Sequence, residues 1–291
     1  MISLSDNIGD EPKFGLGVSF SPAWSSESDV EQTLMAARTA SRCGASLFLA
    51  GDKPGGADEV RSNAVILGWL LNELIGVPRI GFLHLVRQSP VDVMLAQLRT
   101  MGELIVRQGS TPIFGVMRGR EPAMADLPGS SVEEAVDAIR AERCSADAEV
   151  WVAAEYGPAL ERAGRIADVW LANGYYDPES LAGQLRRVEA AAGSRVRAAV
   201  RRDFVVDEVG GRAHQRVRDL LANGYRNGKF TTESLVAGGP GECIERLAEV
   251  ARLGFADVVV RPALDGPEGS EQLQMLFEHW TPAGSGARVD R

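Results

Sequence analysis

The sequence predicts an α/β protein whose eight parallel strands close into a (β/α)8 TIM barrel. Short apolar runs alternate with helix-compatible segments from one end of the 291-residue chain to the other, and such alternation is typical of parallel sheets covered by helices. One barrel of roughly 250 residues plus tails fits this length. No Gly-x-Gly-x-x-Gly follows the first apolar run, which disfavours a doubly wound dinucleotide fold. We expect a single domain over residues 1–291, with flexible tails at about 1–12 and 281–291.

Apolar runs that end at turn residues mark the expected strands. They are Phe14–Phe20, Ala45–Ala50, Arg79–Val86, Pro112–Met117, Val150–Ala154, Ala167–Ala172, Arg195–Val206 and Ala256–Val260. The helices between them begin at capping residues or prolines. We expect Asp29 to cap the first helix, and Ser130 or Ser131 to cap a short helix with Glu133 and Glu134 in its first turn.

The stretch from Glu149 to Tyr176, EVWVAAEYGPALERAGRIADVWLANGYY, carries the clearest pattern. Two apolar runs enclose a helical segment, and the first of them stops at the turn Gly157-Pro158. Glycine lets the backbone approach a ligand closely, and the start of a helix favours anions such as phosphate. The alternative is a plain turn in which Gly157 has only a geometric role.

Charge and cysteine content exclude several classes of partner. The net charge of -9 and pI near 5.0 argue against nucleic acids and anionic membrane surfaces as partners. An anionic ligand would therefore need a local basic site. Cys43, Cys144 and Cys243 are an odd, widely spaced set, which predicts reduced thiols in a cytoplasmic protein. The N-terminus lacks the pattern of a signal peptide, and no apolar run is long enough to span a membrane.

In a barrel of this kind, residues at the carboxyl ends of the strands form the site. The candidates at these positions are Ser19, Ser21, Asp52, Lys53, His84, Arg87, Arg118, Glu155, Tyr156, Gly157, Asn173, Gly174, Tyr175, Tyr176, Arg201, Asp203 and Arg261. Several are cationic, which suits an anionic cofactor. Each also has a simpler interpretation, because His84 lies in an apolar run typical of a core, Arg118 sits in a polar loop, and Asp52 could cap a turn. No catalytic triad, metal-ligand spacing or carboxylate pair is present, so a cofactor would supply the chemistry.

Four segments together resemble the luciferase-like family of flavin-dependent barrels. They are AAEYGPALERAGRIADVWLANG (Ala153–Gly174), PVDVMLAQLRTMGELIVRQGSTPIFGVMRG (Pro90–Gly119), GGPGECIERLAEVARLGFADVVVRP (Gly238–Pro262) and the strand end at Gly51-Asp52, where the family often has Asp-His. Their order and spacing span most of the chain.

The resemblance implies a barrel that binds reduced FMN or the related deazaflavin coenzyme and oxidises or reduces a small organic substrate. It implies cofactor binding by the turn residues Glu155, Tyr156, Gly157, Pro158 and Ala159, with Asn173, Gly174, Arg118 and Arg261 as further contacts. It places His84, Asp52 and Lys53 at the reacting centre. A homodimer and a separate flavin reductase are the partners that it implies.

Three departures keep other interpretations open. Lys53 stands where the family often has His, Tyr156 stands where it often has a second Gly, and the segment between Ala141 and Glu149 is short. A catalytically silent flavin- or phosphate-binding barrel that acts as a carrier or subunit is one alternative. An unrelated phosphate-binding barrel enzyme, such as an isomerase or aldolase, is the other.

Overall fold

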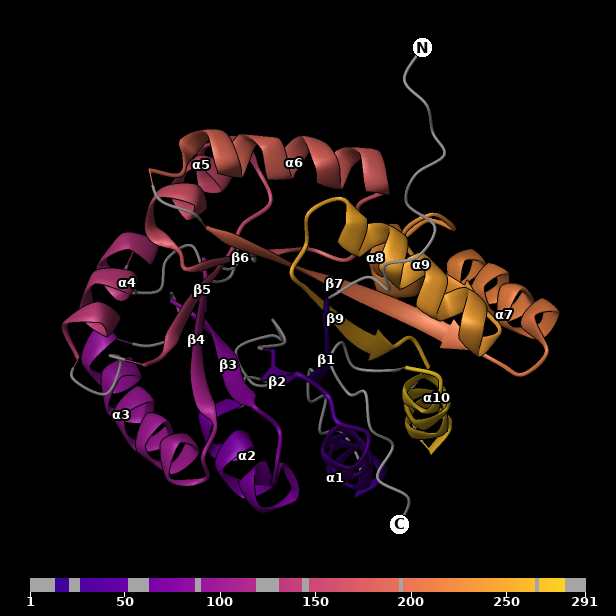
Figure 1. The fold of residues 1–291 in the computed structure, drawn as a ribbon, viewed down its shortest axis with the longest axis horizontal. Helices are drawn as coiled ribbons and strands as arrows, with labels where there is room; N and C mark the ends of the chain where they lie inside the picture. Colours follow the sequence, from indigo (N-terminus) through magenta and orange to yellow (C-terminus); the bar gives the residue numbers. More distant parts are fainter. Residues whose placement is uncertain are drawn as a thin grey trace, which may run out of the picture.

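The computed structural model describes residues 14–20, 27–51, 63–86, 90–118, 131–142, 147–193, 196–264 and 267–280. These residues form a closed ring of parallel strands surrounded by helices (Figure 1). The predicted (β/α)8 barrel is therefore confirmed. Four of the candidate residues, Ser21, Asp52, Lys53 and Arg87, lie outside the described residues.

Eight strands close the barrel. They are β1 (Gly15–Phe20), β2 (Leu47–Ala50), β3 (Arg79–Leu85), β4 (Thr111–Met117), β5 (Glu149–Ala153), β6 (Val169–Ala172), β7 (Arg197–Val206) and β9 (Asp257–Pro262). Each pairs in parallel with the next, and β9 closes the ring by pairing with both β7 and β1.

A ninth strand, β8 (Val236–Gly238), was not expected from the sequence. It pairs with the last three residues of β7, beyond the part of β7 that pairs with β6. Three residues of Val-Ala-Gly are too short an apolar run to stand out in a sequence. The 10-residue β7 therefore pairs with the barrel strands β6 and β9 and also with the additional edge strand β8.

The helices lie around the outside of the ring (Figure 1). They are α1 (Glu27–Arg42), α2 (Asn63–Leu70) with a 3-10 turn (Leu71–Glu73), α3 (Val91–Arg107), α4 (Val132–Ala141), α5 (Gly157–Ile166), α6 (Pro178–Ala191), α7 (Gly210–Ala222), α8 (Tyr225–Gly228), α9 (Pro240–Arg252) and α10 (Pro267–Glu278). Among the described residues, every helix is too short or too polar to cross a membrane.

Two predicted caps had different outcomes. Ser131 caps α4 in a capping box, with its hydroxyl accepting from the Glu134 N-H at 3.1 Å and the Glu134 carboxylate accepting from its backbone N-H at 2.8 Å. The choice of Asp29 as the cap of α1 was wrong, because this helix begins two residues earlier, at Glu27. Acidic residues are favourable throughout a first helical turn, so their presence does not fix the first residue.

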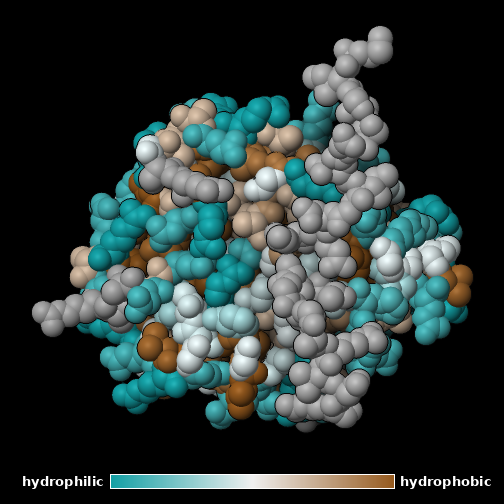
Figure 2. Space-filling view, viewed as in Figure 1, coloured by the Kyte–Doolittle hydropathy of each residue, from teal (hydrophilic) through white to brown (hydrophobic). Residues whose placement is uncertain are grey.

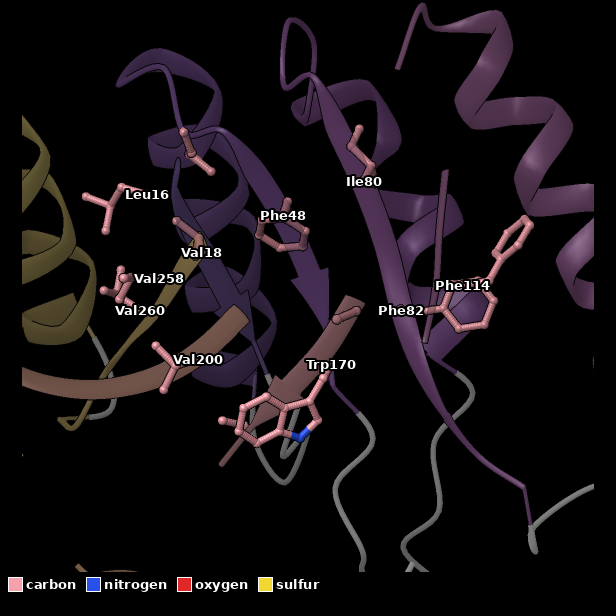
Figure 3. Packing of buried hydrophobic residues seen from close by; sticks show 14 of the residues in the cluster. Leu16, Val18, Phe48, Ile80, Phe82, Phe114, Trp170, Val200, Val258 and Val260 are labelled. Atoms are coloured by element: carbon pink, nitrogen blue, oxygen red, sulfur yellow. The ribbon is translucent and has the colours of Figure 1, made fainter. Parts of the chain in front are cut away.

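The barrel wall has two apolar faces. Side chains that point outward, such as Leu16, Phe48, Phe82 and Trp170, pack in one large cluster between the strands and the helices (Figure 3). The alternate residues fill the barrel interior, and they are Leu47, Leu49, Leu83, Ile113, Trp151, Val169, Leu171, Ala199 and Val259. Because strand side chains alternate between faces, polar residues that continue the interior series lie at the two ends of the barrel.

Candidate functional site

The start of α5 forms a turn with two features that favour an anion. Tyr156 is the N-cap in an extended conformation, and its side chain makes no capping hydrogen bond to the helix. Gly157 and Pro158 open the helix as predicted. A Cβ atom on Gly157 would lie 3.3 Å from both terminal nitrogens of Arg187, on α6. A guanidinium group therefore lies beside the helix N-terminus, which itself carries a partial charge of about +0.5.

The sequence pattern did not point to Arg187, because this residue is 30 positions from Gly157 and lies on a helix, away from any strand end. Its position is fixed by Glu161, one turn into α5, whose carboxylate accepts hydrogen bonds from Nε at 3.0 Å and Nη2 at 2.8 Å. Both side chains are about half exposed. Helix α6 thus supplies a cation that an incoming anion can reach.

Glu155 and Asn173 link the ends of β5, β6 and β7. The Asn173 amide donates to Glu155 Oε1 at 2.6 Å, and Asn173 Oδ1 accepts from the Gly174 N-H at 2.7 Å and from Arg201 Nη2 at 2.9 Å. The Tyr175 hydroxyl donates to Glu155 Oε2. The amide at the end of β6 is therefore held by neighbouring side chains of the protein.

A buried carboxylate lies further along β7, surrounded by arginines. Asp203 is fully buried, and its Oδ2 lies 2.5 Å from Arg261 Nη2 on β9, 3.1 Å from Arg226 Nε and 2.8 Å from the Tyr225 hydroxyl on α8. Arg201, on the same face of β7, places its Nε 3.5 Å from Oδ1. We call these five residues the Asp203 cluster.

The charges in the Asp203 cluster change the pKa values of its members. Burial raises the pKa of Asp203, but the charges of Arg261, Arg201 and Arg226 outweigh it and hold this pKa at about 2. Burial and the neighbouring Arg261 lower the pKa of Arg201 to about 10. Burial and the charge of Asp203 raise the pKa of Tyr225 to about 12. At neutral pH the cluster therefore holds three positive charges and one negative charge.

Some polar atoms of the cluster have no hydrogen-bond partner in the described part of the chain. They are Nε of Arg261, together with Nε of Arg201 and Oδ1 of Asp203, which lie 3.5 Å apart as an ion pair without hydrogen-bond geometry; all three are buried. Buried polar atoms are usually paired, so each unpaired atom needs an explanation. On the opposite face of β7, Nη1 of Arg202 donates to the carbonyl oxygens of Gly174 and Tyr176, both at 2.8 Å, while its Nη2 is also buried without a partner among the described residues.

A second charged group closes the opposite, amino-terminal end of the barrel. Arg79 on β3 makes two hydrogen bonds to Asp257 on β9, at 2.9 and 2.5 Å, and lies 3.7 Å from Glu149 on β5. Arg197 on β7 lies 2.7 Å from Glu149. We call these four residues the Asp257 cluster, in which two positive charges face two negative charges.

The remaining predicted site residues lie apart from these groups. His84 continues the outward series of β3, between Phe82 and Val86, which both pack in the helix-facing cluster. It is 8% exposed, its Nε2 has no partner among the described residues, and burial lowers its pKa to about 4. Arg118 is exposed directly after β4. Their functional roles remain predictions.

The fold matches solved structures over nearly the whole chain, although the sequence matches no family model and no curated protein. The crystal structure of apo-MsnO8 has a TM-score of 0.73 at 16% identity, covering 92% of this chain and 97% of the other. An F420-dependent secondary alcohol dehydrogenase in complex with an F420-acetone adduct has a TM-score of 0.70 at 13% identity, covering 91% and 98%.

A third similar structure is the oxygenating constituent of 3,6-diketocamphane monooxygenase from the CAM plasmid of Pseudomonas putida, in complex with FMN. Its TM-score is 0.70 at 11% identity, and the match covers 91% of this chain and 97% of the other. At these identities the likeness establishes the fold, and it agrees with the luciferase-like resemblance of the sequence.

Proposed function

We propose that the chain is a luciferase-like oxidoreductase of the monooxygenase type, which uses reduced FMN or a deazaflavin coenzyme on a small organic substrate. The observation that carries this proposal is the concentration of cationic side chains and a helix N-terminus at the carboxyl ends of β5, β6, β7 and β9. Structures with the same fold are described with FMN and with an F420 adduct. In such barrels the carboxyl ends of the strands carry the active site.

The residues at the start of α5 fit the phosphate of such a cofactor. Gly157 leaves the turn without a Cβ, the Tyr156 side chain does not cap the helix, and the Arg187 guanidinium lies beside the turn. Backbone N-H groups and an arginine fork are the donors that phosphate oxygens prefer. We assign phosphate binding to the turn from Glu155 to Ala159 together with Arg187, with Asn173 and Gly174 beside it.

When bound, the flavin or deazaflavin supplies the redox chemistry, so the protein needs to bind, orient and shield the reactants. Glu155 fixes the Asn173 amide, and Asn173 in turn orients Arg201. We retain Arg118 as a predicted cofactor contact. We retain His84, Asp52 and Lys53 as the predicted groups for proton transfer, with His84 neutral at pH 7 because its pKa is about 4.

We also propose a homodimer, with a separate reductase that supplies reduced cofactor if FMN is used. Helices α2 and α3 contact each other and carry exposed apolar side chains, with Val65 69%, Trp69 43% and Val93 44% exposed. Figure 2 shows brown side chains interrupting the teal surface at the lower part of the view. Clustered exposed apolar residues are typical of an interface. Analytical ultracentrifugation of native protein and a Trp69→Glu variant tests the dimer, which the variant should weaken.

The cofactor proposal is tested by calorimetric titration with FMN, reduced FMN and the deazaflavin. We expect one of them to bind at micromolar or lower Kd, which is about -8 kcal/mol. Gly157→Trp should abolish this binding because the indole fills the turn. Gly211→Trp, at the exposed start of α7 where a Cβ meets no atom within 4 Å, is the matched control and should bind normally.

Absence of binding by the native protein to all three cofactors would refute the proposal. Equal binding by both tryptophan variants would instead remove the cofactor from the α5 turn. Turnover of a substrate with the bound, reduced cofactor separates an enzyme from the catalytically silent carrier that the sequence left open.

A further inference from the structure

We propose that Arg202 is a positioning residue of the cofactor site. It lies on the helix-facing side of β7, in series with Val200 and Phe204, and its guanidinium group holds the loop between β6 and α6. This loop in turn positions the turn before α5 and the start of α6. The inference rests on the proposed function and adds to it a residue that acts through others, from behind the barrel wall.

The first argument is the way in which Arg202 holds the loop. Its Nη1 donates to the carbonyl oxygens of Gly174 and Tyr176, both at 2.8 Å. These two carbonyls flank Tyr175, so one nitrogen atom fixes the backbone on either side of this residue. A Cβ atom on Gly174 would lie 2.8 Å from the Arg201 carbonyl oxygen, so the loop lies directly against the β7 backbone. The conformation of the loop therefore depends on β7.

The second argument is the connection from the loop to the turn before α5. Glu155 is the first residue of the turn to which we assign the phosphate. Its carboxylate accepts hydrogen bonds from the Asn173 amide, at 2.6 Å, and from the Tyr175 hydroxyl. Both donors lie at the end of β6 and in the loop that Arg202 holds. A shift of the loop would therefore move Glu155 and, with it, the backbone N-H groups that follow in the turn.

The third argument is the connection from the loop to α6. The loop ends at Asp177, the N-cap of α6, and Arg202 holds the carbonyl of the residue directly before this cap. The same helix carries Arg187, whose guanidinium lies beside Gly157. Because a helix is stiff, the placement of its first turn affects the placement of Arg187 further along. Two routes, one through Glu155 and one through α6, therefore lead from Arg202 to the same turn.

The fourth argument is that stability alone does not account for this buried charge. Arg202 is 1% exposed, and its hydrogen-bond partners among the described residues are neutral carbonyl groups. Burial lowers its pKa to about 10, so the group is still charged at pH 7. A buried charge without a contacting carboxylate is unfavourable, and an apolar side chain of similar volume is often at least as stable. Positioning of the loop gives a reason for a guanidinium group at this place.

The test is calorimetric titration of Arg202→Met with FMN, reduced FMN and the deazaflavin, at a temperature where circular dichroism shows the variant to be folded. The cofactor that binds the native protein should bind this variant at least about tenfold more weakly, because a misplaced turn loses contacts to the phosphate. Hydrogen exchange measured by mass spectrometry gives a second readout. The Gly174 N-H, which donates to Asn173 Oδ1 in the native protein, should exchange at least about tenfold faster.

Arg246→Met is the matched control, because Arg246 also donates to two backbone carbonyls, those of Ala237 and Thr232, near β8. It should keep native cofactor affinity. Arg202→Lys keeps the charge and serves if Arg202→Met does not fold. It should weaken cofactor binding by a smaller factor, whereas Arg246→Lys should leave the affinity unchanged. Native affinity in the folded Arg202 variants, or equal losses in the Arg202 and Arg246 variants, would overturn the inference.

Tyr175→Phe tests the middle of the connection. It removes the hydroxyl that binds Glu155 and keeps the ring, so it should weaken cofactor binding at least about threefold. In the double variant with Arg202→Met, the combined loss should be smaller than the product of the two separate losses, because both changes act through the same loop. Fully independent losses would contradict the connection through Tyr175.

The same titrations separate this inference from the proposed function. If the native protein binds none of the three cofactors, the proposed function fails, and the role of Arg202 fails with it. If the native protein and the folded Arg202→Met variant bind a cofactor equally well, only the inference fails. A lower free energy of unfolding in Arg202→Met with unchanged cofactor affinity would show that Arg202 has a structural role alone.

Discussion

The two ends of the barrel interior solve the same physical problem in different ways. At the amino-terminal end, the buried Asp257 and the partly buried Arg79, Glu149 and Arg197 give two charges of each sign. At the carboxyl-terminal end, three arginines converge on Asp203. Buried charges persist when they are paired. The difference separates a group of two arginines and two carboxylates from one in which several arginines share a single buried carboxylate.

Removing a charge from the Asp257 cluster should have the largest effect on the stability of the protein. Asp257→Ala removes the carboxylate that binds Arg79 through two hydrogen bonds. Among the described residues, Arg79 keeps one carboxylate, that of Glu149 at 3.7 Å, and the Ser46 carbonyl oxygen at 3.4 Å. We expect the free energy of unfolding to fall by about 3 to 5 kcal/mol, measured by urea denaturation, because a buried charge loses its partner.

Glu245→Ala is the matched control for this change. It breaks the Arg252–Glu245 pair, whose 2.9 Å contact is exposed on both sides. It should cost less than about 1 kcal/mol, as exposed pairs do. Similar losses in the two variants would mean that the Asp257 cluster contributes no more than a surface ion pair.

Acid titration of stability should reveal the ion pairs of Asp203 at the carboxyl-terminal end of the barrel. The pKa of Asp203 is about 2 in the folded protein against an ordinary value of 3.8, so the folded state binds fewer protons than the unfolded state between these values. The resulting stabilisation is fully present above about pH 4 and is lost as the pH falls toward 2. It amounts to about 2 kcal/mol. Asp203→Asn should remove this part of the pH dependence of unfolding, and an unchanged acid profile would show that Asp203 is not held by ion pairs.

The smallest effect is expected at His84, behind the barrel wall. His84→Leu should change the free energy of unfolding at pH 7 by no more than about 1 kcal/mol, since the imidazole is buried with an unsatisfied nitrogen. The native protein should lose stability as the pH falls from 6.5 toward 4, because the unfolded state takes up the proton first. The variant should lack this loss. A turnover rate reduced by a factor on the order of one hundred or more would support the proton-transfer role proposed for His84, and an unchanged rate would contradict it.

The barrel was predictable because parallel strands buried on both faces leave long apolar runs, such as Val150–Ala154, that stop at turn residues. The β5–α5–β6 unit was predicted with its turn at Gly157-Pro158, and the structure has it there. Strand β8 was missed because pairing with β7, rather than its own composition, makes it a strand.

The candidate site was only partly predictable. Residues at strand ends, such as Asn173 and Arg261, follow from the fold, since all carboxyl ends meet at one face. Arg187 and Arg226 lie on helices, and only tertiary packing brings them to Gly157 and Asp203. The inward direction of Arg201 rather than Arg202 depends on register, which a short apolar pattern does not fix.

The segment between β7 and β8 is separate from the strands that close the barrel. Residues 207–235 leave the barrel after β7 and return at β8, and Figure 1 shows α7 standing out from the ring. This excursion contributes Tyr225 and Arg226 to Asp203, while the strands contribute Arg201 and Arg261. Substitutions in this segment would therefore change the groups that surround Asp203 without altering the strands of the barrel.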